Sequence, residues 1–554
     1  MIHTWRLKNF KSIKGSMEQL ELSDLNVFAG INSSGKSTLI QSILLVSQSL
    51  LGPNEEIPLM LNGDLVSLGS FEDVWNNGDI SQPLEIEFIV SSPEFDNARA
   101  YYNLTFEAAT NNSQLSTVNI KNALLGWAEE RYPDDFSELE ITRQGDDLII
   151  TYASEETEEE IQRELTNRAL TLDNAKIRLK YFIPDGIAVR GRKSVDDFTW
   201  VDLFTDPLSE KSEDYLSVDK DQIPDNIYTI LIKTIENLGL PHIPSNPIRF
   251  LRNKNKTFFE RYREWFKRLK TDDSDKLRKL LANDRSGTTI EYTDWFNPNA
   301  LSKLGQLVEN YFKTKVRYLS ANRIPPTLLF KLTPPIEWAE VGIDGHNVAS
   351  ALNEYGTHTI TYWDPTQKKI AEQSLLEATL TWMQHLGLVD SLSTKSENKL
   401  GISLYLTTEG VTRPLDLTSV GFGTSQVLPI IVQGLLTPAG GTFIVEQPEV
   451  HLHPKLQSKL AYFFYALTKA NVQCIVETHS DHIINQLRVL VAEEDIRKHI
   501  RIYFAQRDIA SGTKFEKVVL GRNGNIQNWP ADFLSEGSKL TRELLNAART
   551  ASES

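Results

Sequence analysis

The feature that most constrains the fold is an apolar run, a glycine-rich loop and a helical pattern that follow one another within residues 25–51. The run LNVFAG (25–30) predicts a buried strand that passes into a loop. In the segment KSTLIQSILLVSQSLL that follows, apolar residues recur at helical spacing, at Leu39, Ile43, Val46 and Leu50. A strand, a loop and a helix in this order predict an α/β fold.

The loop fits the pattern G-x-x-x-x-G-K-[ST] in full, and it has the strand before it and the helix after it that the pattern requires. Its glycines let the backbone curl so that N–H groups point at phosphate oxygens, and the helix N-terminus adds a positive end. We expect Lys36 to reach the β- and γ-phosphates of a nucleotide and Ser37 to coordinate Mg²⁺. The candidate nucleotide-binding residues are Gly30, Asn32, Ser33, Ser34, Gly35, Lys36, Ser37 and Thr38.

Strand patterns return after about residue 312, and two of them, GTFIVEQ and VQCIVETHS, end in polar groups before a helical pattern. This is typical of the carboxyl edge of a buried parallel sheet. We therefore predict one nucleotide-binding core built from both ends of the chain, with the middle inserted. The predicted parts are an N-terminal lobe (1–79), an insertion of strands and then mainly helices (80–311), a C-terminal lobe (312–490) and a closing segment with a disordered tail (491–554).

The ends of these two strands carry the remaining candidate groups. Glu446 ends the first strand, where an acid can hold Mg²⁺ directly or through water. His479 ends the second, where a neutral imidazole could contact the γ-phosphate or the attacking water; alone, it would more often be a structural histidine. Upstream, Gly421 and Gly423 precede Thr424 and an apolar helical pattern, which predicts a second helix N-terminus with exposed hydroxyls.

The bulk properties limit the class of protein. The chain has 554 residues, which is too long for one ordinary hydrophobic core, and 40% of the residues are hydrophobic. No run of 18 apolar residues and no secretory signal are apparent, so we expect a cytoplasmic protein without membrane contact. The only cysteine, Cys474, is expected to be a buried strand residue. A net charge of -16 means that nucleic acid could bind only at a local basic patch.

Taken in order, these motifs resemble the ABC-type ATPases of the SMC/RecF superfamily, and most closely the OLD-like group that includes the ATPase subunit of Septu-type anti-phage systems. The segments concerned are WRLKNFKSI, GINSSGKSTLI, VGFGTSQVLPI, FIVEQPEVHLHP and ETHSDHII, and the closing GRNGNIQNWPADFLSE resembles a bacterial subgroup with no assigned activity. The resemblance implies ATP and Mg²⁺ as ligands and Glu446, Gln447 and His479 as catalytic positions. It also implies a homodimer or higher even oligomer, in which Gly421, Gly423 and Thr424 of one subunit act on the nucleotide of the other.

Two positions depart from the family pattern. Gly421 stands where the signature usually has serine, and Gln447 stands where the catalytic glutamate is expected. An amide can orient the attacking water but cannot accept its proton, so slow ATP hydrolysis is expected. Glu449, His451 or His453 could supply the missing group; alternatively, HLHP is a loop packed on an amphipathic helix that contains Leu456, Leu460, Phe463 and Leu467.

The insertion contains one basic and aromatic stretch, residues 249–278, with eleven Lys or Arg and five acids. It could bind nucleic acid, but the net charge of -16 favours an amphipathic helix with buried aromatics and solvated charges. The acidic run at 155–160 reads as a solvated loop or helix face. Downstream of His479, Asp495 and Asp508 do not form the acidic pair of a Toprim nuclease, so any nuclease should be a separate chain.

The sequence thus predicts an ATP-binding, slowly hydrolysing ABC-type ATPase that serves as sensor or scaffold for a separate effector, such as a nuclease, in anti-phage defence. Two alternatives remain open at this stage. One is a self-sufficient, DNA-stimulated ATPase of DNA repair or chromosome maintenance, which should turn over rapidly with DNA. The other is a structural module whose nucleotide is never hydrolysed.

Overall fold

A computed structural model describes residues 1–108, 118–165, 175–194, 289–331, 340–508, 510–528, 530 and 543–544. Three predicted features lie outside these residues: the basic stretch at 249–278, most of the helical region around it, and the tail at 548–554. By its internal contacts the chain forms two units. The first contains residues 1–140, 180–183 and 303–554, and the second contains residues 141–179 and 184–302. The predicted boundaries at 80 and 311 are not tested by this division and stay a prediction.

The strands are β1 (Ile2–Lys8), β2 (Leu20–Glu21), β3 (Leu25–Gly30), β4 (Leu84–Ser91), β5 (Arg99–Ala108), β6 (Val118–Ala128), β7 (Ser137–Gln144), β8 (Asp147–Ala153), β9 (Lys176–Lys180), β10 (Ile183–Ser194), β11 (Thr289–Phe296), β12 (Val316–Leu319), β13 (Thr359–Asp364), β14 (Lys369–Ser374), β15 (Ser391–Ser396), β16 (Ile402–Thr407), β17 (Leu415–Asp416), β18 (Thr442–Glu446), β19 (Gln473–Thr478), β20 (Ile500–Asp508) and β21 (Gly512–Val518).

The α-helices are α1 (Lys36–Leu51), α2 (Phe71–Val74), α3 (Glu155–Leu165), α9 (Asn299–Asn310), α10 (Val348–Tyr355), α11 (Leu375–Leu386), α12 (Phe422–Leu436), α13 (Pro454–Lys469) and α14 (Asp481–Glu494). Short helical turns are η1 (Asn76–Gly78), η2 (Pro93–Phe95), η5 (Tyr311–Lys315), η6 (Asn398–Leu400) and η7 (Leu417–Ser419). In the described ranges, none of the helices is both long enough and apolar enough to cross a membrane.

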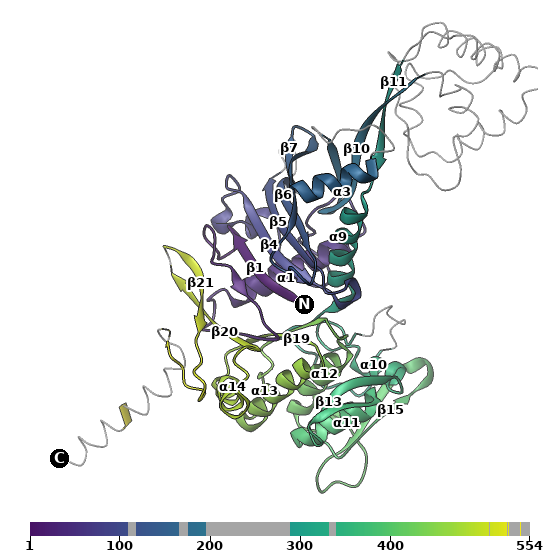
Figure 1. The fold of residues 1–554 in the computed structure, drawn as a ribbon. Helices are drawn as coiled ribbons and strands as arrows, with labels where there is room; N and C mark the ends of the chain where they lie inside the picture. Colours follow the sequence, from purple (N-terminus) through teal and green to yellow (C-terminus); the bar gives the residue numbers. More distant parts are fainter. Residues whose placement is uncertain are drawn as a thin grey trace, which may run out of the picture. The chain divides into compact units, whose positions relative to one another are not determined.

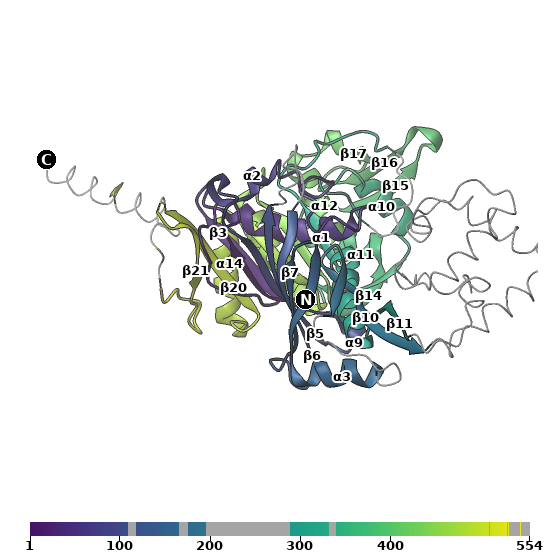
Figure 2. The same ribbon diagram turned by 90° about the horizontal axis from the view of Figure 1, so that it is seen from above.

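The first unit is centred on a six-stranded sheet with the order β12-β18-β19-β3-β20-β21. Every neighbouring pair is parallel except β20 and β21, which are antiparallel. Strand β3 comes from the N-terminal end of the chain and lies between two strands from the C-terminal end, and Figure 2 shows it beside β20 and β21. The predicted α/β core assembled from both ends of the chain is therefore confirmed.

Helices cover both faces of this sheet. In Figure 1, α1 lies on one side of it and α12, α13 and α14 lie on the other. Because side chains alternate along a strand, Leu25 and Val27 of β3 join the apolar core under α12–α14, whereas Phe28 faces the opposite way and stacks on Tyr503 of β20. The apolar positions predicted for the helix at 454–469 are buried, so the prediction of an amphipathic helix there is confirmed.

In the first unit, the strands β2-β1-β4-β5-β6 follow one another in this order within a larger second sheet, and each neighbouring pair among them is antiparallel. Its inner face carries stacked aromatics: the ring centroids of Trp5 and Phe88 are 5.2 Å apart, and those of Phe88 and Tyr102 are 5.4 Å apart. The Trp5 indole N–H donates to Ser42 Oγ of α1 at 2.9 Å. This sheet thus holds the helix that follows the glycine-rich loop.

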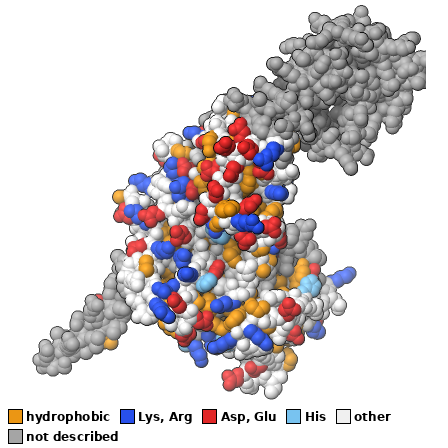
Figure 3. Space-filling view, viewed as in Figure 1, with side chains coloured by type: hydrophobic (Ala, Val, Ile, Leu, Met, Phe, Trp, Pro, Cys, Tyr) orange, Lys and Arg blue, Asp and Glu red, His pale blue; other side chains and the backbone are white. Residues whose placement is uncertain are grey.

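Smaller elements complete the two units. In the first unit, the hairpin β13-β14 and the sheet β15-β16-β17 pack with α10 and α11. In the second unit, β8 pairs with β9 and β10 pairs with β11. The acidic run at 155–160 lies in α3, where Thr157 is buried and most of the glutamates are exposed, so it is a solvated helix face as predicted. On the surface shown in Figure 3, acidic and basic side chains are interspersed.

Candidate functional site

The glycine-rich loop connects β3 to α1, and its backbone geometry explains its two glycines. Gly30 has φ +150° and Gly35 has φ +97°, a region that favours glycine. A Cβ atom at Gly30 would lie 2.5 Å from the carbonyl oxygen of Ala505, and one at Gly35 would lie 2.3 Å from Thr513 Oγ1. Strands β20 and β21 therefore support the loop from outside, and only glycine fits at these two points.

The loop keeps its chemically important side chains buried. Lys36 Nζ donates to the carbonyl oxygens of Gly30 at 3.1 Å and Ile31 at 2.9 Å, so the ammonium folds over its own loop. Burial lowers the pKa of Lys36, against the opposing influence of nearby carboxylates. Ser34 is 1% exposed, and its Oγ has no hydrogen-bond partner among the residues that the structure describes. A buried hydroxyl and a buried ammonium at the N-terminus of α1 fit a phosphate ligand.

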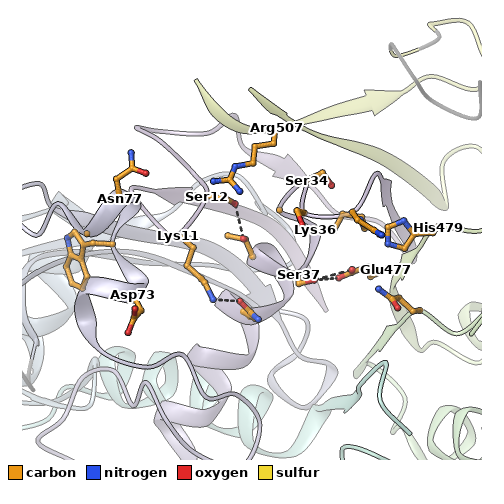
Figure 4. Close-up of a pocket in the computed structure, with 18 of the residues that line it drawn as sticks. Lys11, Ser12, Ser34, Lys36, Ser37, Asp73, Asn77, Glu477, His479 and Arg507 are labelled. Atoms are coloured by element: carbon orange, nitrogen blue, oxygen red, sulfur yellow. Dashed lines mark hydrogen bonds between the residues drawn. The ribbon is translucent and has the colours of Figure 1, made fainter. Parts of the chain in front are cut away.

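A cavity of about 760 Å³ opens in front of the loop. Among the predicted residues it is lined by Asn32, Ser33, Ser34, Gly35, Lys36, Ser37, Thr38, Gln447 and His479. Figure 4 shows Lys36, Ser37, Glu477 and His479 together, with Lys11, Asp73 and Asn77 on the other side. Glu446, Gly421, Gly423 and Thr424 are not among the lining residues. The structure thus joins two distant segments of the chain in one polar cavity.

The carboxyl ends of β18 and β19 lie side by side at this cavity. Glu446 and Glu477 are register partners on the two parallel strands, so their side chains leave the same face of the sheet. Ser37 Oγ donates to the carboxylate of Glu477, at 3.1 Å from Oε1 and 3.0 Å from Oε2. Within the described residues, no hydrogen bond joins Ser37 to Glu446. The carboxylate that meets the phosphate-loop serine is therefore on β19, not at the predicted position on β18.

Glu446 has other neighbours. The Tyr318 hydroxyl and the backbone N–H of Ala321 lie near its carboxylate and oppose the rise of its pKa. Burial, followed by repulsion from Glu477, raises the pKa of Glu446 to about 7. Arg323, which is 8% exposed, donates from Nη2 to the carbonyl oxygens of Glu446 at 2.8 Å and Gln447 at 3.2 Å. Glu446 is thus held by groups of its own chain behind the cavity wall.

The turn after β18 fixes Gln447 in an unusual conformation. Gln447 has φ +41°, a backbone angle that residues other than glycine rarely adopt. Its N–H donates to the carbonyl oxygen of Glu477 at 2.7 Å, and its own carbonyl accepts from Arg323. Strain of this kind persists only where the surroundings enforce it, and it often occurs at functional positions. Here the conformation places the Gln447 side chain on the cavity wall.

Glu449 connects this turn to His479. Its Oε1 accepts a hydrogen bond of 2.6 Å from the backbone N–H of His479. Burial raises the pKa of the Glu449 carboxyl. Burial and the nearby Lys36 ammonium lower the pKa of His479, which favours the neutral imidazole expected at this position. Of the three proposed substitutes for a catalytic glutamate, Glu449 thus contacts the lining residue His479, but it does not line the cavity itself.

The two histidines have structural contacts. His453 is the N-cap of α13, and its Nδ1 accepts from the backbone N–H of Lys455 at 3.3 Å. His451 packs edge-on against Phe422, with ring centroids 4.9 Å apart. Neither lines the cavity. These contacts agree with the interpretation of HLHP as a loop packed on a helix.

The signature segment, VGFGTSQVLPI (420–430), contains the start of a helix, as predicted, but its hydroxyls are not exposed. Helix α12 begins at Phe422, with Gly421 as its N-cap and Gly423 within its first turn. Thr424 is 5% exposed and Ser425 7% exposed, and Ser425 Oγ donates to the Phe422 carbonyl at 2.7 Å. The prediction of exposed hydroxyls was wrong because the helix turns this side inward. Phe422 is instead 42% exposed, and a Cβ at Gly421 would meet no atom within 4 Å.

Several lining residues were missed by the sequence reasoning: Glu477, Lys11, Ser12, Trp75, Asn77 and Arg507. Only Glu477 carried a readable signal, because it is a lone acid in the otherwise uncharged buried strand QCIVET. Ser12 Oγ lies 2.9 Å from Thr38 Oγ1, and Lys11 Nζ donates to Gln41 Oε1 at 2.8 Å. These contacts come from the turn after β1, which lies in the segment WRLKNFKSI; no role at the nucleotide was predicted for its residues.

The donor set also fits a magnesium ion. Hydroxyl, carboxylate and amide oxygens are the ligands that Mg²⁺ prefers alongside phosphate, and Ser37, Glu477 and Gln447 present them on one side of the cavity. Burial raises the pKa of both carboxyls at these adjacent strand ends, so a cation bound nearby would stabilise their ionised forms. When bound with ATP, the ion would neutralise charge on the phosphates.

Comparisons with known proteins identify two families. The profile of the family described as AAA ATPase domain matches residues 1–484. The profile of "Protein of unknown function (DUF3696)" matches residues 497–544 and includes the segment likened above to a subgroup without assigned activity. No curated protein sequence matches the chain.

Among solved structures, similar chains include SMC head domains. One, from Pyrococcus furiosus with an extended coiled coil and bound to the C-terminal domain of ScpA, has 11% identity and a TM-score of 0.32, over 98% of this chain and 99% of that one. The SMC head domain from Thermotoga maritima has 7% identity and a TM-score of 0.32, over 94% and 99% of the two chains. At these TM-scores the likeness carries no argument.

Proposed function

Because the chain belongs to the AAA ATPase domain family, whose profile spans residues 1–484, we propose that it is an ATP-binding, slowly hydrolysing ABC-type ATPase. Membership of this family implies nucleotide binding and ATP hydrolysis in general. The observation that carries the proposal is the convergence of Lys36, Ser37, Gln447 and His479 on one cavity. Slow turnover, dimerisation and a separate effector are the finer parts of the proposal.

Each residue of the cavity has a distinct proposed task. The loop N–H groups and Lys36 bind the triphosphate; the ammonium exchanges its bonds to Gly30 and Ile31 for bonds to phosphate oxygens. Ser37 and an acid at the end of β18 or β19 hold the ion that accompanies ATP. Neutral His479 donates to the γ-phosphate or orients the attacking water. Gln447 orients the same water through its amide.

The rate follows from Gln447. A general base contributes about 10²- to 10⁴-fold to a proton-transfer step. However, phosphoryl transfer has a loose transition state, and a water-orienting glutamine supports turnover on the order of 10⁻⁴ s⁻¹ in GTPases without an activator. We therefore propose tight binding of ATP and slow hydrolysis, with acceleration by a partner.

The test compares the wild type with Gln447→Glu for retention of bound nucleotide and for phosphate release in single turnover. We expect the glutamate variant to release phosphate faster, by up to about 10²- to 10⁴-fold, with unchanged ATP affinity. A wild type that turns over rapidly, with a glutamate variant that is no faster, would disprove slow hydrolysis. Strong stimulation by DNA without any partner would favour the DNA-stimulated ATPase instead.

The signature residues support a dimer. Gly421, Gly423 and Thr424 do not line the cavity of their own chain, and the resemblance assigns them to the nucleotide of a second subunit. We propose that two copies enclose two nucleotides and that the ATP-bound dimer is the signalling state. Light scattering with ATP and with ADP tests this; equal mass in both states would contradict it.

The effector and the defence role rest on the resemblance to Septu-type ATPase subunits. We propose a separately encoded effector, such as a nuclease, that responds to the state of the dimer. The test is phage challenge of cells that carry this gene with and without its neighbouring genes. Protection that requires a neighbour and the Lys36 side chain supports the proposal, whereas a defect in DNA repair on deletion supports the alternative.

A further inference from the structure

Building on the proposed function, we propose that Glu477, at the end of β19, supplies the protein carboxylate for the Mg²⁺ that accompanies ATP. Glu446, at the position expected from the motif, then acts only at longer range. The proposal concerns which of two neighbouring acids contacts the ion, and it rests on their different partners.

The first observation is the direct contact between Glu477 and the phosphate loop. Both carboxylate oxygens of Glu477 accept from Ser37 Oγ, at 3.1 and 3.0 Å. A serine at this position of the loop is a standard magnesium ligand. An oxygen donor that already meets this hydroxyl can share a small octahedral ion with it after a short movement.

The second observation is that the charge of Glu477 is poorly balanced. Glu477 is 2% exposed, and in the described part of the chain no lysine or arginine forms an ion pair with it. Lys36, the cation that influences it most, donates to two backbone carbonyls instead. Buried carboxylates are normally paired or bound to a metal, so Glu477 has the surroundings of a ligand whose cation arrives with the nucleotide.

The third observation is that Glu446 has neighbours other than the phosphate loop. Tyr318, the Ala321 N–H and Arg323 lie near its carboxylate and lower its pKa, and Arg323 Nη2 donates to its backbone carbonyl at 2.8 Å. It does not line the cavity, whereas Glu477 does. Its repulsion of Glu477 instead strengthens the attraction of the cavity for a cation.

The experiment measures metal affinity rather than turnover. The full-length protein is titrated with Mn²⁺ in the presence of a non-hydrolysable ATP analogue, and bound Mn²⁺ is read by electron paramagnetic resonance. The affinity for a fluorescent ATP analogue is measured in parallel with EDTA. The variants are Glu477→Gln and Glu446→Gln, and Glu72→Gln is the matched control because it removes one charge from the exposed rim of the same cavity.

We expect Glu477→Gln to weaken Mn²⁺ binding by at least about 10-fold, a typical effect of losing a group that supports a metal. Glu446→Gln should weaken it by less than about 3-fold and Glu72→Gln by less than about 2-fold, since neither contacts the ion. Binding of the analogue in EDTA should persist in all three variants. A larger loss in Glu446→Gln than in Glu477→Gln, or equal losses, would overturn the proposal.

Two further results keep the outcomes distinct. If Glu477→Gln does not fold, Glu477→Asp retains the charge but withdraws it from Ser37 by one methylene, and it should also weaken Mn²⁺ binding; unchanged binding would overturn the assignment. If the wild type binds neither the analogue nor Mn²⁺ with it, the proposed function itself fails, whichever acid was assigned.

Discussion

The ends of β18 and β19 are neighbours in one sheet and carry register-paired glutamates, yet their surroundings differ. On β18, the carboxylate of Glu446 lies near Tyr318, the backbone N–H of Ala321 and Arg323. On β19, Glu477 faces the phosphate-loop hydroxyl of Ser37. The motif is on β18, but the contact with the loop is on β19. A sequence motif therefore locates the edge of the sheet where chemistry occurs, while side-chain packing decides which acid is presented there.

The largest expected effect is that of Lys36→Ala. This substitution removes the ammonium that lies near Glu477, at the end of β19, and Glu449, in the turn after β18. Loss of two charge-assisted hydrogen bonds to phosphate, at about 1.5–3 kcal/mol each, should weaken ATP binding by about 100-fold or more. Isothermal titration calorimetry measures this directly. Lys14→Ala is the control, because Lys14 Nζ donates to the Ala510 carbonyl at an exposed site. If both variants bind ATP like the wild type, Lys36 is not a phosphate ligand.

Sequence reasoning succeeded where a pattern follows from the backbone. The strand, loop and helix at 25–51, the parallel strand ends and the amphipathic helix after HLHP each have a periodicity that can be read along the chain. It failed for groups whose position depends on packing between distant segments. Lys11 and Ser12 reach the cavity from the turn after β1, and Arg507 reaches it from β20. The burial of Thr424 depends likewise on which side of α12 faces inward.

The second prediction tests the support behind β18. Arg323 donates to the carbonyl oxygens of Glu446 and Gln447. It also lies near the buried carboxyls of Glu449 and Glu446. Arg323→Met should lower the free energy of unfolding by roughly 3–5 kcal/mol, because it leaves buried negative charge uncompensated. Denaturation by urea measures the change.

The control for this prediction is Arg497→Met. The ion pair of Arg497 with Asp495 is exposed, so its loss should change the free energy of unfolding by less than about 1 kcal/mol. Arg323→Lys keeps the charge but not the guanidinium fork that reaches both carbonyls, so it should fall between the wild type and Arg323→Met. Equal stability of the Met variants at positions 323 and 497 would mean that the end of β18 does not need the buried cation.

The smallest expected effect concerns the link between the two strand ends. Glu449, in the turn after β18, accepts the backbone N–H of His479 just after β19 at 2.6 Å. Glu449→Ala removes the acceptor of this hydrogen bond and should free this amide at a cost of roughly 1–3 kcal/mol, so its hydrogen exchange should accelerate by about 10-fold or more. Glu449→Gln keeps an acceptor oxygen and should retain most of the protection. If alanine leaves the exchange of the His479 amide unchanged, the two strand ends are positioned independently, and the difference between their acids arises within each strand end alone.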